Sequence, residues 1–197
     1  MALRFSTRPH KQFLWFLIRR DASFGKGLAV GLDAGCADMG NRRFFETAAY
    51  IGVDPDAALL AKGKGKYPDA EIHNCKILEA TVSADFVHCI QVFVNADFAK
   101  HEAVEATRKL VSMVRPGGVL LMNTGAKTIQ YDQEICELLQ SAFEEVTEIR
   151  YGNFGVKRVP LFFSLAIAAI MYLIPAMRLV GGHSKTYFRC VARKSSV

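Results

Sequence analysis

Two aspartates and the small residues that follow the first of them are the groups in this sequence best suited to hold a ligand. Asp33 precedes the small residues of segment 34–37 at the end of an apolar run, and Asp54 closes the next apolar run twenty-one positions later. Small residues after a strand let backbone N–H groups approach a ligand closely and permit positive φ. A carboxylate at a strand end can accept two hydrogen bonds at once. The pattern indicates a site for a polar small molecule at the ends of two strands.

The elements that must position these residues alternate along the chain. Apolar runs predict strands, and helical spacing or a helix-starting residue predicts helices between them. A turn is expected at Arg115-Pro116-Gly117-Gly118, before the fifth strand. The alternation indicates an α/β fold with a mostly parallel sheet and helices on both faces. Strands are expected at 28–35, 49–54, 71–75, 85–95, 119–123, 146–153 and 186–193, and helices at 11–20, 41–48, 55–64, 98–113 and 132–143.

Over roughly residues 28–125 the sequence resembles the class I (Rossmann-like) S-adenosylmethionine-dependent methyltransferase superfamily. The first motif of that family has an acidic residue followed by three alternating glycines, and here it stands as GLDAGCADMG. Asp33 and Gly35 match the motif, Ala37 and Met39 replace its second and third glycines, and Gly40 comes one position late. The resemblance implies one doubly wound, seven-stranded, mostly parallel sheet with an antiparallel last strand, forming a single domain over 1–197.

The resemblance also implies S-adenosylmethionine as methyl donor, with S-adenosylhomocysteine as product. Asp33 would accept a hydrogen bond from, or balance the charge of, the amino-acid part of the donor, and Asp54 would hold both ribose hydroxyls. The family often places a carboxylate after the third strand to contact adenine, and Asn74, Cys75 and Lys76 stand there instead. The residues expected to bind the donor are Asp33, Gly35, Cys36, Ala37, Asp54, Pro55, Asn74, Cys75 and Gln91.

Two other interpretations stay open. Segment 35–40 also satisfies a relaxed G-x-A-x-x-G dinucleotide pattern, which would suit an NAD(P)-binding Rossmann oxidoreductase. A carboxylate at Asp33 would repel a pyrophosphate, and the Pro-Gly-Gly turn favours the methyltransferase. The replacements at Ala37 and Met39, together with the missing adenine carboxylate, leave room for a non-catalytic binding protein of the same fold.

The acceptor side is less defined by the sequence. Methyl transfer from a sulfonium needs a positioned nucleophile more than a dedicated base. No catalytic residue is therefore assigned. Two weak candidates are Gln91, toward the end of the fourth strand, and His183, after two glycines. For His183, a solvated loop histidine is the better interpretation. His88, within an apolar strand, is interpreted as a satisfied core histidine.

The acceptor is expected to be a small molecule or a lipid-linked or saccharide substrate. The sequence has no concentrated basic–aromatic array and no appended recognition domain, so no nucleic-acid partner is expected.

The uncharged run 159–177 is the most unusual stretch of the chain, within an apolar insertion at about 159–180. Its length reaches that of a spanning helix, but in the resembled fold the flanking strands belong to one sheet, and Pro175 interrupts the run. Three interpretations remain: a lid over the acceptor pocket, a peripheral membrane contact flanked by basic residues, or a buried or dimer interface. The helix at 11–20 would share the same surface.

Composition limits the remaining possibilities. With 51% hydrophobic residues and a net charge of +6, the chain is a mildly basic globular protein and not a disordered one. Five widely spaced cysteines without a C-x-x-C pair indicate a reducing compartment, and no metal site is expected. The apolar run at 13–18 is short for a signal peptide. We therefore expect a cytoplasmic protein, in contact with the inner face of a membrane if it is peripheral, and the sequence assigns no oligomeric state.

Overall fold

The computed structural model describes residues 5–95, 100–154 and 156–194. Its centre is a seven-stranded sheet in the order β3-β2-β1-β4-β5-β7-β6. β7 runs antiparallel to both of its neighbours, and the other pairings are parallel. The predicted fold class is confirmed. The strands are β1 (Val30–Ala34), β2 (Ala49–Val53), β3 (Glu71–His73), β4 (Ala84–Cys89), β5 (Val114–Asn123), β6 (Glu145–Tyr151) and β7 (Lys185–Val191).

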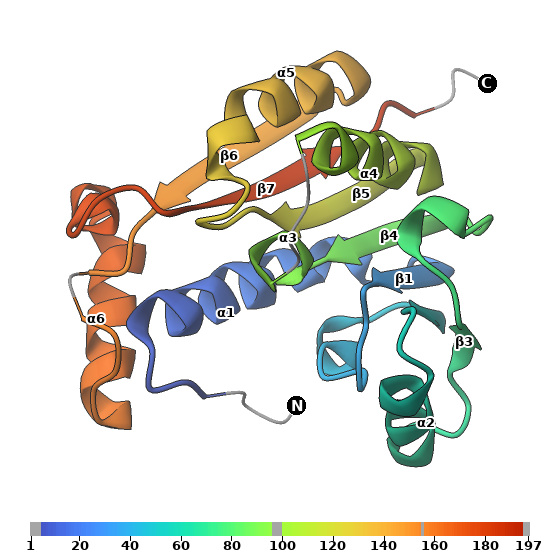
Figure 1. Cartoon of the computed structure of the whole chain (residues 1–197), viewed down its shortest axis with the longest axis horizontal. Coiled ribbons are helices and arrows are strands. Elements are labelled where there is room, and N and C mark those ends of the chain that lie inside the picture. The colour runs from blue at the N-terminus through green and yellow to red at the C-terminus, as the bar shows by residue number, and fades with distance from the viewer. Residues whose placement is uncertain (1–4, 96–99, 155, 195–197) are drawn as a thin grey trace.

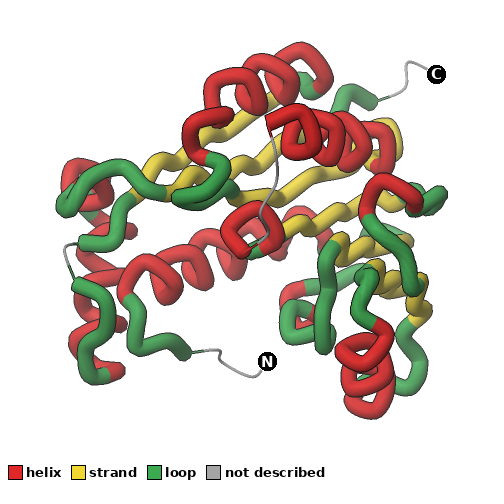
Figure 2. The backbone as a smooth tube through the Cα atoms, in the orientation of Figure 1, coloured by secondary structure: helices red, strands yellow, loops and turns green. Residues whose placement is uncertain are grey.

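Helices cover both faces of the sheet (Figures 1 and 2). One apolar layer joins α1, α2 and α6 to the sheet, and the other joins α3, α4 and α5 to the opposite face. The helices are α1 (Pro9–Asp21), α2 (Ala57–Lys66), α3 (Val92–Asn95), α4 (Lys100–Met113), α5 (Asp132–Ala142) and α6 (Leu161–Leu173). Short 3-10 turns are η1 (Ala22–Gly25), η2 (Arg42–Phe44), η3 (Ile77–Glu79), η4 (Ile129–Tyr131) and η5 (Pro175–Leu179).

Near the first two strands, one expected helix is wrong and another is present with a later start. The helix expected at 41–48 is only the turn η2, because the adjacent Phe44 and Phe45 both pack inward, on Trp15 and Tyr50, and Phe45 is already extended. The helix expected from Pro55 begins two residues later, at the start of α2. Asp56 caps it, accepting hydrogen bonds of 3.0 Å from two backbone N–H groups in its first turn.

Two further expectations concern the middle of the sheet. The predicted strand 85–95 ends at Cys89 and is followed by α3, because a continuous apolar run does not distinguish a buried strand from a buried helix. The expected turn at Arg115-Pro116-Gly117-Gly118 lies inside β5. Between the pairs Ala84–Val114 and Phe86–Val119, β5 contains four residues opposite one on β4, so the Pro-Gly-Gly sequence forms a bulge.

The apolar insertion forms α6 and η5, which are separated at Pro175. α6 packs across the N-terminal part of α1, on the side of the sheet toward which the arrows of β4, β5 and β6 point (Figure 1). The Ser164 hydroxyl of α6 donates a 2.6 Å hydrogen bond to the Ser6 carbonyl before α1. In the described part of the chain, no helix is long and apolar enough to cross a membrane.

Candidate functional site

The loop after β1 is fixed to the end of the neighbouring strand. The N–H groups of Gly35 and Cys36 donate to the Val53 carbonyl, at 2.7 and 3.1 Å. Gly35 has a φ of +79°, and a Cβ at this position would lie 2.2 Å from Cγ2 of Val92 in α3. Only glycine combines this backbone conformation with such a close approach of α3. The loop and α3 therefore meet at the carboxyl ends of β1 and β4.

The two positions that depart from the family's glycine pattern keep a glycine-like backbone. Ala37 has a φ of +47° and Met39 a φ of +58°. The left-handed region costs a residue with a side chain about 1 kcal/mol or more. Met39 is fully buried, and a Cβ on Gly63 of α2 would lie 2.8 Å from its Cγ, so α2 packs tightly on this side chain. Packing of Met39 against α2 thus holds the loop in the conformation that glycine would adopt freely.

Asp54 follows β2 and joins the loop to the start of α2. One carboxylate oxygen, Oδ2, accepts a 2.8 Å hydrogen bond from the Ala37 N–H, and Oδ1 accepts one of 2.9 Å from the Asp56 N–H. Two ionised oxygens offer about four acceptor positions, so about two remain for a ligand. Asp54 lines the cavity described below, where such a ligand would approach it.

A cavity of about 640 Å³ opens above these strand ends, within the size range of small-molecule sites. It extends from the loop after β1 to α1 on one side and to η3 and α4 on the other. The residues that line it are Lys11, Trp15, Gly35, Cys36, Ala37, Asp38, Gly40, Asn41, Asp54, Pro55, Lys76, Ile77, Leu78, Ile90, Gln91, Val92, Glu102 and Ala106.

Six of the nine expected donor-binding residues line this cavity: Gly35, Cys36, Ala37, Asp54, Pro55 and Gln91. Asp33 does not line it; the side chain is fully buried and its Oδ2 accepts a 3.0 Å hydrogen bond from the Tyr50 hydroxyl. Asn74 and Cys75 also lie outside the lining. The Asn74 amide donates to the carbonyls of Asp54 and Pro55, at 3.1 and 3.0 Å, so Asn74 holds the turn that carries Asp54.

The sequence reasoning missed the walls that come from distant parts of the chain. Lys11 and Trp15 belong to α1, and Glu102 and Ala106 belong to α4. Their spacings of four residues place each pair on one helix face, but only the packed fold shows which face meets the cavity. Trp15, the only tryptophan of the chain, is also stacked on Phe44 at 5.7 Å between ring centroids.

The two weak catalytic candidates lie in different places. Gln91 has a φ of +68°, and its backbone N–H donates a 2.7 Å hydrogen bond to the Asn123 side chain at the end of β5. It lines the cavity just beyond β4. His183 lies in an exposed loop outside the lining, with Nε2 at 2.9 Å from the Thr186 hydroxyl and 3.8 Å from an Asp132 oxygen. Of the two, Gln91 is placed to contact a ligand.

His88 belongs to the core beneath the site. It is fully buried on β4, with its ring centroid 4.5 Å from that of Phe45 and 4.9 Å from that of Phe86. Neither ring nitrogen has a hydrogen-bond partner among the described residues, so the core position is as expected but the expected hydrogen bonding is not found. Burial lowers the pKa of His88 to about 3.

This pKa makes a prediction for acid stability. Below about pH 6.5 His88 binds a proton in the unfolded chain, but in the folded chain it stays neutral down to about pH 3. The free energy of unfolding is therefore unaffected by His88 protonation above about pH 6.5, and it falls as the pH drops toward 3. Between pH 7 and 5 the free energy of unfolding should fall by about 2 kcal/mol less in His88→Leu than in the wild type. Urea unfolding at both pH values measures this, and equal losses would contradict it.

Comparison with known proteins agrees with this geometry. A family model described as a methyltransferase domain matches residues 32–122. No curated protein matches the sequence. The chain has the fold of class I methyltransferases, and the matched segment contains the loop after β1, Asp54 and the bulged β5. Residues 32–122 therefore match a methyltransferase domain, and the chain shares the fold of solved S-adenosylmethionine-dependent methyltransferases.

Several solved structures share the fold at low sequence identity. The N-methyltransferase NodS from Bradyrhizobium japonicum WM9 has a TM-score of 0.63 at 13% identity, covering 95% of this chain and 97% of that one. Magnesium protoporphyrin IX methyltransferase (ChlM) from Synechocystis PCC 6803, with bound S-adenosylmethionine, has a TM-score of 0.59 at 14% identity, covering 93% of this chain and 82% of that one. An rRNA methylase from Streptococcus thermophilus has a TM-score of 0.57 at 10% identity, covering 98% of this chain and 99% of that one. Their names span different acceptors, so the likeness defines the fold and not the acceptor.

Proposed function

We propose that this methyltransferase acts on a small-molecule acceptor, and specifically on a lipid, lipid-linked or saccharide substrate presented at a membrane surface. The observation that carries the proposal is an apolar, solvent-facing stripe on α6 beside a basic region of the protein. S-adenosylmethionine supplies an electrophilic methyl group for in-line displacement by an O, N or C nucleophile. The residues of this chain bind the donor, orient the acceptor and exclude water.

The cavity offers a donor contact for each part of S-adenosylmethionine. The remaining acceptor positions of Asp54 suit the two ribose hydroxyls. The backbone of Gly35 and Ala37 faces the amino-acid part, with the buried Asp33 carboxylate beneath the loop balancing its positive charge. Adenine would lie against segment 76–78, which lines the cavity where the family often has a carboxylate. We assign Asn74 and Cys75 to the support of this wall.

The acceptor end lies beyond β4. Gln91 lines the cavity between α3 and the loop after β1, so its amide is suited to contact the acceptor or the transferred group. We assign no general base, and His183 is not required, because a positioned nucleophile is the main need of this reaction.

The outer face of α6 is apolar and uncovered. Phe162 and Leu173 are each 76% exposed, Phe163 is 58% exposed and Ile170 is 39% exposed. At 100° per residue these four side chains fall within one sector of the helix, opposite the buried Ser164, which faces α1. An uncharged helix with an apolar outer face suits the interface between lipid headgroups and acyl chains. We call these four residues the α6 stripe.

Charge supports an anionic membrane as the partner of the α6 stripe. All nineteen acidic residues lie between Asp21 and Glu148. The charged side chains outside this range, on α1 up to Arg20, next to α6 and on β7, are therefore all basic. Lys157 and Arg158 are exposed immediately before α6. Basic side chains beside an inserted apolar helix are attracted to anionic headgroups. With five free cysteines, which suit a reducing compartment, we place the protein in the cytoplasm at the inner face of a membrane.

Vesicle flotation tests the membrane proposal. The protein should float together with vesicles that contain an anionic phospholipid. With vesicles of neutral lipid in high salt, it should stay at the bottom of the gradient. The double variant Phe162→Asp/Leu173→Asp should lose flotation, since two charges would enter the apolar interface. Leu59→Asp is the matched control, because Leu59 is an exposed leucine on α2, away from the stripe. Unchanged flotation of the double variant, or a stripe that mediates only self-association, would contradict the proposal.

Methyl transfer to extracted cell material tests the acceptor class. Protein incubated with methyl-labelled S-adenosylmethionine and either the organic or the aqueous fraction of a cell extract should label a lipid or a saccharide-bearing small molecule. Labelling of RNA alone would overturn the proposed acceptor class and leave the superfamily assignment unchanged. The Asp54→Ala variant serves as the blank, because its donor site is altered.

A further inference from the structure

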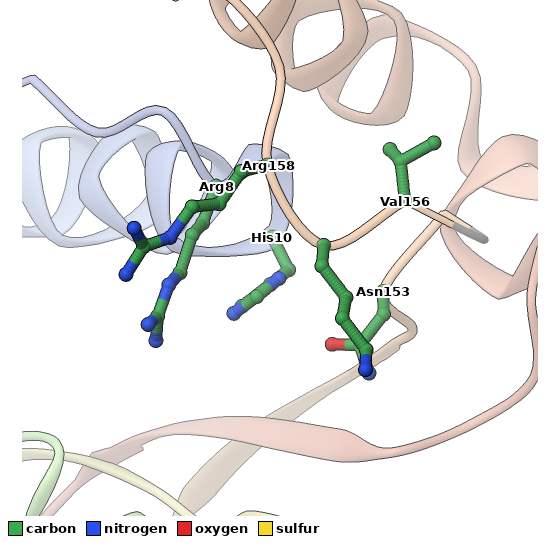
Figure 3. A pocket seen from close by; sticks show the side chains of 6 residues that line it. Arg8, His10, Asn153, Val156 and Arg158 are labelled. Atoms are coloured by element: carbon green, nitrogen blue, oxygen red, sulfur yellow. The ribbon is translucent and has the colours of Figure 1, made fainter.

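A second cavity, of about 740 Å³, lies between the start of α1 and the loop that follows β6. The residues that line it are Arg8, His10, Asn153, Val156, Lys157 and Arg158. Figure 3 shows the Arg8 and Arg158 side chains extending in the same direction from two different segments, with His10 beside them. We infer that this basic cavity binds a phosphate group and thereby anchors a phosphorylated methyl acceptor.

The cavity gathers positive charge without a compensating acid. Three of its six lining residues are arginine or lysine, a fourth is His10, and none is acidic. Across the described ranges, no carboxylate forms an ion pair with Arg8, Lys157 or Arg158. Guanidinium groups bind phosphate oxygens through paired hydrogen bonds, and they do so best when no protein carboxylate occupies them. The lining thus favours an anion with several oxygens.

Groups behind the lining strengthen the positive potential. Lys185, at the start of β7, is only 8% exposed, and its Nζ donates a 2.8 Å hydrogen bond to the Asn153 side chain. Burial, followed by the nearby Arg8, lowers the pKa of Lys185. Burial, followed by Lys185, Arg8 and Lys11, lowers the pKa of His10 to about 4. A bound dianion would offset this mutual repulsion, so the cavity stabilises an anion at neutral pH.

The basic cavity is next to the donor cavity. His10 lines the first and Lys11 lines the second, so neighbouring residues in the first turn of α1 contribute to the two cavities. β6 runs parallel to β5 and β4, and the loop after β6 therefore lies at the same edge of the sheet as the loops after β1 and β4. A molecule whose phosphate occupies the basic cavity can extend past α1 toward Gln91.

The loop that lines this cavity leads into α6, which carries the α6 stripe. Arg158 precedes the first residue of α6 by three positions. A phospholipid or lipid-linked phosphate would place its headgroup in the cavity and its chains along α6, while a soluble phosphate ester would use the cavity alone. Phosphate recognition is common to both sources. The role of the phosphate as an acceptor anchor rests on the proposed function, but phosphate binding by the cavity does not.

Phosphate binding can be measured directly on the full-length protein. We would titrate inorganic phosphate and glycerol 3-phosphate in calorimetry and compare vesicles of neutral lipid with and without phosphatidic acid. The variant Arg8→Gln/Arg158→Gln should weaken binding of the phosphate probes at least about tenfold. Arg108→Gln/Arg193→Gln removes the same charge from exposed positions outside the cavity and should leave binding unchanged.

A resonance of His10 provides a second readout. A phosphate bound among Arg8, Lys157 and Arg158 should raise the pKa of His10 above its value of about 4. Imidazole resonances followed through a pH titration, with and without phosphate, measure this shift. An unshifted pKa would contradict a phosphate at the side chain.

The outcomes separate the phosphate site from the donor site. S-adenosylhomocysteine affinity should be unchanged in Arg8→Gln/Arg158→Gln, so its loss would show a folding or donor-site defect instead. Binding of soluble phosphates identifies a soluble source, and binding only of phosphatidic acid vesicles identifies a lipid headgroup; either supports the inference. Equal binding by both double variants, no binding of any phosphate probe, or tighter binding of a short oligoribonucleotide that uses the same arginines would overturn it.

Discussion

Asp54→Ala should weaken binding of S-adenosylhomocysteine about 100-fold. A hydrogen bond to a charged group contributes about 1.5–3 kcal/mol, and loss of two ribose hydrogen bonds therefore costs about 3 kcal/mol at the low end. The carboxylate also accepts the N–H groups of Ala37 and Asp56, so the same substitution loosens the loop that faces the donor. Calorimetry measures the affinity, and a change in the emission of Trp15, which lines the cavity, offers a second readout.

Two variants separate ribose binding from loop support. Asp54→Asn keeps one acceptor oxygen for the Ala37 N–H and should bind with intermediate affinity. Asp56→Ala removes the cap of α2 and should lower stability by about 1 kcal/mol without changing the affinity for S-adenosylhomocysteine. An Asp54→Ala variant that is folded and binds like the wild type would refute the assignment of Asp54 to the ribose.

Gly35→Ala should lower the free energy of unfolding by about 3 kcal/mol and weaken donor binding by an order of magnitude. The left-handed backbone costs an alanine about 1–2 kcal/mol, and overpacking against Val92 costs about 1–3 kcal/mol. The new Cβ would lie 2.2 Å from Val92 Cγ2, so α3 must move away from the loop. Urea unfolding and calorimetry measure the two effects.

Gly27 provides a matched control for the backbone part of this effect. Gly27 has the same φ of +79°, but nothing lies within 4 Å of the Cβ that alanine would add. Gly27→Ala should therefore show only the conformational cost and full donor affinity. Gly35→Ala/Val92→Ala should regain the part of the stability that the contact removed. If Gly35→Ala and Gly27→Ala lose equal stability and bind equally well, the close approach of α3 has no part in the site.

The sheet was predictable because its signals are local. Apolar runs separated by helical spacing give a parallel α/β sheet, and Asp54 could be placed at a strand end from the run that precedes it. The antiparallel last strand came from the family resemblance and not from periodicity. These signals were enough to predict six of the residues that line the donor cavity, because all six follow the ends of strands.

Features that depend on packing were not predictable. α3 continues the apolar composition of β4, and only the contact of Val92 with the loop after β1 shows that the chain turns there. Trp15 and Glu102 reach the cavity because α1 and α4 pack at opposite ends of it, which helical spacing alone does not define. The basic cavity joins Arg8 to Arg158, which lie 150 positions apart. The concentration of all acids between Asp21 and Glu148 is visible in the sequence, but it does not place Arg8 beside Arg158.

The most direct test of the central claim is calorimetry of the full-length protein with S-adenosylhomocysteine and NAD in parallel. A methyl-donor site built from Asp54 and the loop after β1 predicts one-site binding of S-adenosylhomocysteine with micromolar affinity, and no binding of NAD at the same concentrations. Micromolar binding of NAD without binding of S-adenosylhomocysteine would contradict the methyltransferase account.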